Sequence, residues 1–133
     1  MIDVRSSFPI LYVASVAASL GFYRDLLGFR VVYTFPAGDD PGFASLCLSE
    51  SGDKIGLSAN SYDPGHGLPI RGVDARSVEL CLEVPDVDAA TRALRAAGVA
   101  ILEEPKDRPW GERVAFVADP DGNPVHLRAP ILA

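Results

Sequence analysis

Two stretches of the chain begin with the residue alternation that is typical of a β-strand, at 9–13 and again at 78–84. Each is followed by a short polar residue that can cap a helix, Ser15 in the first and Asp86 in the second. Apolar residues then recur at helical spacing, and each helical pattern ends at a glycine, Gly28 or Gly98, that can take the left-handed conformation. The pattern therefore predicts a strand and a helix at the start of each stretch.

Three further strands are predicted after each helix. They span 30–35, 43–49 and 54–59 in the first stretch, and 100–104, 113–118 and 124–128 in the second. The ends of the two stretches also match residue by residue, because Gly52, Ile55 and Leu57 recur at constant spacing as Gly122, Val125 and Leu127. We interpret the chain as two copies of one βαβββ unit.

The repeat predicts an α+β fold in which tandem βαβββ repeats form open, curved mixed sheets around a cleft. We expect a single domain, 1–133, made of repeat 1 (about 7–60), a linker (about 61–75) and repeat 2 (about 76–130). The linker sequence is rich in Gly, Pro and Asp and has no periodicity, so it is expected to join the repeats or to cover a pocket.

Composition narrows the function classes. The chain has 133 residues, 48% of them hydrophobic, and a formal net charge of −6, which disfavours nucleic acid and anionic membranes as partners and favours cationic or neutral ligands. No apolar run is long enough to span a membrane. The two cysteines, Cys47 and Cys81, lie in apolar runs, so we expect buried packing thiols and a cytoplasmic location.

Three segments, in this order on a βαβββ repeat, resemble the vicinal oxygen chelate superfamily. They are "SLGFYRDLLGF" (19–29), "EVPDVDAA" (83–90) and "PWGERVAFVADPDGNPVHL" (109–127). That superfamily includes glyoxalase I, extradiol dioxygenases, fosfomycin resistance enzymes and bleomycin resistance proteins, and the pattern is most similar to the last of these. The resemblance implies a cleft formed where paired units meet, and hence a homodimer, which would also give the edge strands of the sheets a partner.

The resemblance also implies four positions for metal ligands, on the first and last strand of each repeat. These positions hold Phe8 and Gly56 in repeat 1, and Glu79 and His126 in repeat 2. Phe8 and Gly56 cannot coordinate a metal, so Glu79 and His126 form an incomplete set where a catalytic centre normally has three protein donors. We therefore expect no cofactor, and keep a divalent metal (Zn, Ni, Mn or Fe) at Glu79 and His126 as the alternative.

Strand periodicity assigns other side chains to the cleft, because alternate residues share a face. If Leu11 and Val13 pack on the helix, repeat 1 presents an apolar and aromatic face, while the corresponding face of repeat 2 is polar. The cleft positions predicted in this way are Phe8, Ile10 and Tyr12 in repeat 1, and Glu79, Cys81, Glu83, His126 and Arg128 in repeat 2.

Two side chains in repeat 2 have more than one interpretation. His126 can form a hydrogen bond with Glu79, act as a metal ligand or serve as a general base. Trp110, the only tryptophan, can pack against the end of the sheet as a plug. The resemblance to bleomycin resistance proteins implies instead that its indole lines the cleft and stacks on planar rings, with Tyr33, Phe35 and Phe43 as aromatic candidates for the opposite side.

Two functions remain after these observations. The first is a non-enzymatic protein, similar to bleomycin resistance proteins, that sequesters a planar aromatic or cationic metabolite or antibiotic. The second is a metal-dependent lyase, isomerase or dioxygenase of the glyoxalase type that uses Glu79 and His126. The incomplete ligand set and the acidic net charge favour the first.

Overall fold

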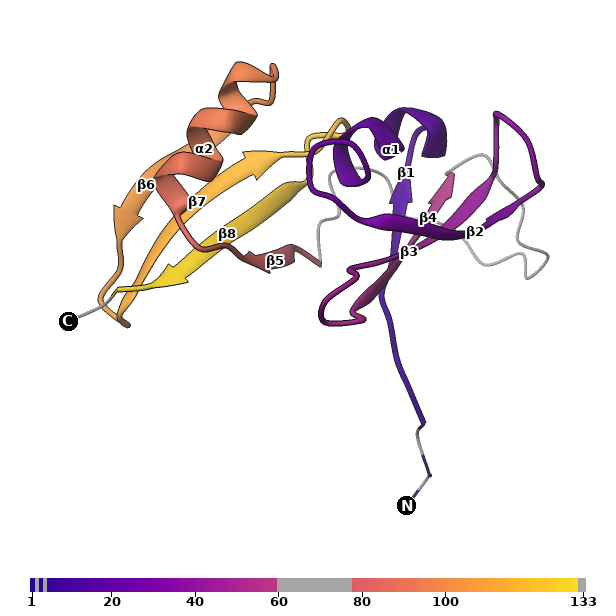
Figure 1. The fold of residues 1–133 in the computed structure, drawn as a ribbon, viewed down its shortest axis with the longest axis horizontal. Coiled ribbons are helices and arrows are strands. Elements are labelled where there is room, and N and C mark those ends of the chain that lie inside the picture. The colour runs from indigo at the N-terminus through magenta and orange to yellow at the C-terminus, as the bar shows by residue number, and fades with distance from the viewer. Residues whose placement is uncertain (2, 4, 60–77, 132–133) are drawn as a thin grey trace. The chain divides into compact units, whose positions relative to one another are not determined.

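The computed structural model of the chain describes Met1, Asp3 and residues 5–59 and 78–131. Two compact units, Met1–Ile70 and Arg71–Ala133, make up the chain, and each contains one βαβββ series of elements (Figure 1). The predicted linker at 61–75 lies outside the described residues. Among the described residues, no helix is both long and apolar enough to cross a membrane.

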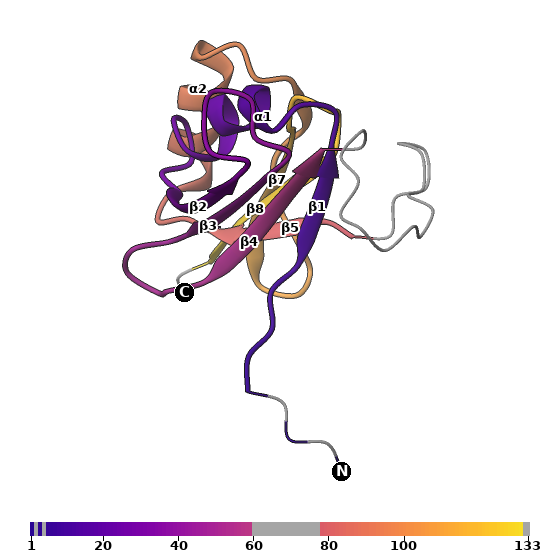
Figure 2. The ribbon, with the colours of Figure 1, turned by 90° about the vertical axis from the view of Figure 1, so that its right-hand side faces the viewer.

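The first unit contains one helix and a four-stranded mixed sheet. Its elements are β1 (Ile10–Val13), α1 (Val16–Tyr23), β2 (Arg30–Phe35), β3 (Phe43–Cys47) and β4 (Lys54–Ala59). The strand order is β1-β4-β3-β2, and β1 and β4, which are parallel, run side by side in Figure 2. The other two pairs are antiparallel.

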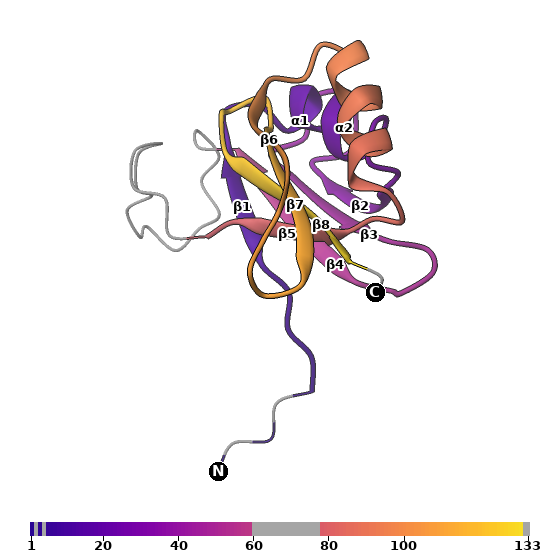
Figure 3. The same ribbon diagram turned by 90° about the vertical axis from the view of Figure 1, so that its left-hand side faces the viewer.

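The second unit repeats this arrangement. Its elements are β5 (Leu80–Glu83), α2 (Val87–Ala96), β6 (Ile101–Asp107), β7 (Glu112–Ala118) and β8 (Pro124–Pro130). The order β5-β8-β7-β6, with β5 parallel to β8, matches the order in the first unit (Figure 3). Two helices and two mixed sheets confirm the predicted α+β class and the βαβββ repeat.

Both helices begin at the predicted caps. The Ser15 hydroxyl accepts a hydrogen bond from the Ala18 N–H at 3.1 Å, and the Asp86 carboxylate accepts one from the Ala89 N–H at 3.0 Å. Gly28 (φ 82°) and Gly98 (φ 88°) both have the left-handed conformation, and Gly98 directly follows the C-cap of α2.

Helix α1 is shorter than the sequence predicts. It ends at Tyr23, whereas the helical spacing continued to Leu27. Residues 24–27 form a wider turn, in which the Leu27 N–H donates to the Phe22 carbonyl rather than to that of Tyr23. Hydrophobic spacing persists through this turn, so the pattern alone could not place the end of the helix.

One face of each sheet packs against the helix of its own unit. In the first unit, Val13, Leu46 and Leu57 are fully buried, as are Val16 and Tyr23 of α1. Burying a side chain of this size contributes roughly 1.5–3 kcal/mol each. In the second unit, the corresponding core consists of Val87, Leu94, Val117, Val125 and Leu127, and α2 lies over β6, β7 and β8. The repeated positions Leu57 and Leu127 thus have the same environment.

The opposite face of the first sheet is open in its unit. Ile10 and Tyr12 are 44% and 41% exposed, whereas Val13 between sheet and helix has no exposed surface. The alternation therefore assigns the faces of β1 as predicted. An open, strongly apolar sheet face is the feature that positions the aromatic candidates described below.

A buried aspartate organises the turn between β7 and β8. The Asp119 carboxylate accepts hydrogen bonds from the N–H groups of Asp121 (3.0 Å) and Asn123 (2.8 Å), and from the Asn123 side-chain amide (3.1 Å). Gly122 takes a positive φ of 80° in the same turn. These bonds explain the oxygen-rich "DPDGN" segment as a β-turn between strands.

Candidate ligand-binding site

The strand register brings the polar candidates of the second unit onto one face. Cys81 lies opposite His126, and Glu83 lies opposite Arg128, in the β5–β8 pair. On the other side of β8, Phe116 of β7 is the partner of His126. Because directly paired residues share a face, these side chains all lie opposite the face that packs on α2.

His126 is oriented by a carboxylate and a ring. Its Nδ1 lies 3.2 Å from a carboxylate oxygen of Glu79, and its ring centroid lies 4.7 Å from that of Phe116. Nε2 is buried and has no hydrogen-bond partner among the described residues. When Nδ1 carries the proton that is donated to Glu79, Nε2 presents a lone pair that can accept a hydrogen bond.

Trp110 lies in the turn between β6 and β7, where its indole is exposed. The Gly111 N–H donates to the Arg108 carbonyl at 3.1 Å, and Gly111 has a φ of 91° that a residue with a side chain would rarely adopt. Pro109 and Trp110 are thus the central residues of the turn. Trp110 is 62% exposed, which contradicts the alternative in which the ring plugs the end of the sheet.

Glu112 links the exposed indole to the sheet through hydrogen bonds. The indole Nε1 of Trp110 donates to one carboxylate oxygen of Glu112 at 2.9 Å, and Nη1 of Arg128 donates to the other at 2.8 Å. The Arg128 hydrogen bond lowers the pKa of Glu112, and the bond from Trp110 adds to this, while partial desolvation acts in the opposite direction. Glu112 is therefore a carboxylate at neutral pH.

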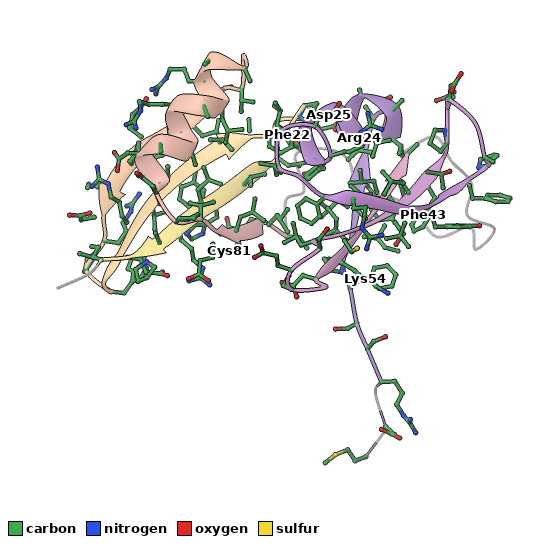
Figure 4. The ribbon with its side chains drawn as sticks, viewed as in Figure 1. Phe22, Arg24, Asp25, Phe43, Lys54 and Cys81 are labelled. Atoms are coloured by element: carbon green, nitrogen blue, oxygen red, sulfur yellow. The ribbon has the colours of Figure 1, made fainter. Side chains whose placement is uncertain are left out.

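Cys81 differs from the sequence prediction. It is exposed on β5 rather than buried, whereas Cys47 on β3 is buried as expected (Figure 4 labels Cys81). The sulfur of Cys47 accepts a hydrogen bond from Nη2 of Arg30 at 3.3 Å. Cys81 and Glu83 lie on the open face of β5 and are exposed, whereas Leu80 and Leu82 on the other face of the same strand are half-buried. The apolar run suggested burial, whereas strand alternation had placed Cys81 among the cleft positions.

The aromatic candidates of the first unit share the open face of their sheet. Register pairs Tyr12 with Ser58, Ser58 with Phe43, and Phe43 with Phe35, so these residues form one row across the four strands. The ring centroids of Tyr33 and Phe43 are 6.5 Å apart. Phe8, two residues before β1, is exposed, as are Tyr12, Tyr33 and Phe35.

Gly56 provides space for two of these apolar side chains. A Cβ atom at this position would lie 3.0 Å from Cγ1 of Ile10 and 3.1 Å from Cε2 of Phe43, which is labelled in Figure 4. The glycine thus allows the Phe43 ring to lie across β4. Packing gives a physical reason for the missing side chain at a position where the family resemblance implied a metal ligand.

Within the described residues, Glu79 and His126 are the two possible metal donors that lie together. Glu79 and His126 lie together, but no group of three His, Cys, Asp or Glu side chains within 5–59 and 78–131 is arranged to hold a metal ion. Two donors leave most of the coordination shell to water or substrate. The contacts that the structure shows at His126 are a hydrogen bond to Glu79 and a ring contact with Phe116.

Two contributors to this face were not among the sequence-predicted site residues. Phe116 packs on His126, and Glu112 connects Trp110 with Arg128. Strand alternation could have placed both on one face, because they are four residues apart on β7. The choice of hydrogen-bond partners could not have been inferred, since it depends on the shape of the turn.

The paired βαβββ units, each with one sheet face covered by its helix and the other open, define a protein of the glyoxalase fold class. The chain belongs to the Glyoxalase/Bleomycin resistance protein/Dioxygenase superfamily, whose family model matches residues 6–127. This confirms the resemblance inferred from the three sequence segments.

Individual relatives agree with this assignment. A bleomycin resistance protein of Geobacillus stearothermophilus is 30% identical over 124 residues, covering 88% of this chain and 90% of the relative. The crystal structure of a virulence protein of Salmonella typhimurium superposes with a TM-score of 0.71 at 26% identity, covering 98% of this chain and all of the other (100%). A superfamily member from Sphaerobacter thermophilus (TM-score 0.72, 24% identity, 96% and 98% covered) shares the fold.

Proposed function

We propose that this protein is a non-enzymatic binding protein that sequesters a planar aromatic or cationic metabolite or antibiotic. The observation that carries the proposal is the exposed indole of Trp110, whose Nε1 donates a hydrogen bond to Glu112 at 2.9 Å. A large exposed aromatic ring offers a flat apolar surface on which a planar ligand can stack.

Charge and composition support this ligand class. The net charge of the chain is −6, and the carboxylates of Glu79, Glu83 and Glu112 lie on or beside the open face of the second sheet. The open face of the first sheet carries the exposed aromatic residues Tyr12, Tyr33 and Phe35. Aromatic faces attract planar rings and cations alike.

Bleomycin is the first ligand to test, because relatives that are 30% identical to the chain are bleomycin resistance proteins. Trp110 is the only tryptophan, so intrinsic fluorescence reports on this one side chain. We expect bleomycin, or a planar cation, to change the emission, and Trp110→Ala to weaken binding about tenfold, measured by calorimetry. Leu102→Ala, which removes an exposed apolar side chain of β6, is the matched control. Equal affinity of wild type and Trp110→Ala would reject the proposal.

A metal-dependent lyase, isomerase or dioxygenase is the second candidate function. It is favoured by the buried Nε2 of His126, which has no partner among the described residues and is oriented by the bond between Nδ1 and Glu79. Elemental analysis of protein purified without added metal separates the two functions. We expect well below one metal per chain; close to one zinc, nickel, manganese or iron would favour the enzyme.

The assembly and location of the protein are part of the proposal. We expect a homodimer, because four-stranded open sheets leave β1, β2, β5 and β6 as edge strands and expose apolar side chains such as Val32. Sedimentation at micromolar concentration tests this, and a monomer that binds ligand normally would contradict it. Two unpaired cysteines agree with a cytoplasmic location, and sequestration of an antibiotic there would confer resistance.

A further inference from the structure

Three side chains from the turn, β7 and β8 form a continuous hydrogen-bonded chain. Arg128 donates to one oxygen of the Glu112 carboxylate, and Trp110 donates to the other. Glu112 is the only member that contacts both of the other two in these bonds. Its carboxylate therefore connects the most exposed member, the indole, to a central strand of the sheet.

The indole needs such a connection if it is to keep one orientation. A ring that is 62% exposed has little packing to select one of its rotamers. The donor at its edge has a single acceptor, and that acceptor is charged, which makes the hydrogen bond stronger than one between neutral groups. Arg128 in turn limits the rotation of the Glu112 side chain, whose exposed fraction is only 24%.

We propose that Glu112 is a positioning residue that fixes the orientation of the Trp110 indole. The inference rests on the proposed function, because it makes Trp110 a preformed platform for a planar ligand. It also restricts the ligand class: Nε1 is already bonded to Glu112, so the site selects molecules that stack on the indole face and need no donor from its edge. Affinity then depends on a residue that does not itself contact the ligand.

Trp110 fluorescence tests the orientation without any ligand. Time-resolved anisotropy and acrylamide quenching should show a more mobile and more accessible indole in Glu112→Ala, with a quenching constant raised about twofold or more. Glu112→Gln, which keeps the side-chain shape but places an amide NH₂ against one of the two donors, should lie between Glu112→Ala and wild type. Glu104→Gln, at an exposed carboxylate of β6 that is paired with Arg95, is the control and should match wild type. Wild-type anisotropy and quenching in folded Glu112→Ala or Glu112→Gln would overturn the proposal.

Ligand binding separates this proposal from the proposed function. Calorimetry with bleomycin and with ethidium, a planar cation, should show about threefold to tenfold weaker binding in Glu112→Ala, because binding must then order a mobile indole. A mobile indole in the variant together with no binding by the wild type would support positioning and reject the binding function. Wild-type affinity in Glu112→Ala, with affinity lost in Trp110→Ala, would reject positioning alone. Melting curves identify any variant that is not folded, and Glu112→Gln then provides the test.

Discussion

The imidazole of His126 and the carboxylate of Glu79 lie 3.2 Å apart, while the Phe116 ring packs against the imidazole at 4.7 Å. The His126 side chain is 16% exposed and that of Glu79 is 49% exposed, so the two partners have unequal surroundings. A carboxylate that loses its partner here remains hydrated. The contribution of His126 to stability should therefore come mainly from its ring.

Variants of His126 and Glu79 distinguish the stability contributed by the imidazole ring from that contributed by the hydrogen bond. We expect His126→Ala to lower the free energy of unfolding by roughly 2 kcal/mol, since it removes a mostly buried ring and its aromatic contact. His126→Phe should retain most of this stability, and Glu79→Gln should change it by about 1 kcal/mol or less because the pair is partly exposed. Urea unfolding measures all three. Equal losses in His126→Ala and His126→Phe would show that the hydrogen bond dominates.

Gly56→Ala should destabilise the first unit. The new Cβ would meet Ile10 at 3.0 Å and Phe43 at 3.1 Å, so one of these side chains must move, at a cost of about 1–3 kcal/mol. Gly21→Ala is a control that we expect to raise, rather than lower, the stability of the first unit. Gly21 lies inside α1, a Cβ atom added there would have no neighbour within 4 Å, and a helical alanine is favoured over glycine by roughly 0.5–1 kcal/mol. Thermal unfolding of both variants tests the pair, and an unchanged midpoint for Gly56→Ala would contradict it.

Arg113 of β7 forms ion pairs with Asp88 of α2 and Asp107 of β6, and the stabilisation from the pair with Asp88 should be lost at acidic pH. Arg113 donates to both oxygens of Asp88 at 2.7 and 3.0 Å, and to Asp107 at 2.9 Å. The hydrogen bond from Arg113 lowers the pKa of Asp88. The ionised Asp88 carboxylate therefore contributes its full stabilisation above the pKa of an unfolded aspartate, about 3.9. This stabilisation is lost as the pH falls through the lower pKa that Asp88 has in the folded state.

The variant Asp88→Asn tests this dependence. We expect it to be less stable than wild type at pH 7 and to approach wild type below pH ~3, measured by urea unfolding across that range. Asp25→Asn, which breaks an exposed pair with Arg24 (both labelled in Figure 4), is a control for general charge effects. A difference between Asp88→Asn and wild type that stays constant with pH would contradict the role of the ionised carboxylate.

Trp110 emission should also respond to acid through Glu112. Arg128, and secondarily Trp110 itself and the charge of His126, keep the pKa of Glu112 below its usual value. The emission should therefore remain constant as the pH falls toward about 4.3, the ordinary value for glutamate, and change only below it, when protonation weakens the bond to the indole. Glu83 and Cys81 on β5 also lie near Arg128, so Glu83→Gln is a necessary control. The transition should be absent in Glu112→Gln; an identical transition there would assign it to another group.

The sequence predicted the elements well because the signals are local. Ser15 and Asp86 cap their helices, and Gly98 directly follows the end of α2 with a positive φ, as their residue types indicate. Gly28 also has a positive φ, but α1 ends before it, at Tyr23. Alternation also placed Tyr12 on the open face. Cys81 was wrongly expected to be buried, because its apolar neighbours do not show that it lies on the open face of its strand.

The site was predicted less completely because it depends on side-chain geometry. The Glu79–His126 contact was among the alternatives for His126 and is present in the structure. Glu112 was not considered, because its contact with Trp110 requires the turn at Gly111 to bring two residues of neighbouring sequence together on one side. Such a bond leaves no periodic signal in the sequence.

The Asp119 turn has a consequence for the order in which the second unit folds. Its carboxylate closes a turn of a few residues with three hydrogen bonds, so β7 and β8 can pair early, on the microsecond timescale of an isolated hairpin. Strand β5 pairs with β8 in parallel and only after a much longer loop, which includes α2 and the hairpin, has closed. The first strand of the unit to leave the ribosome should thus be the last to join its sheet.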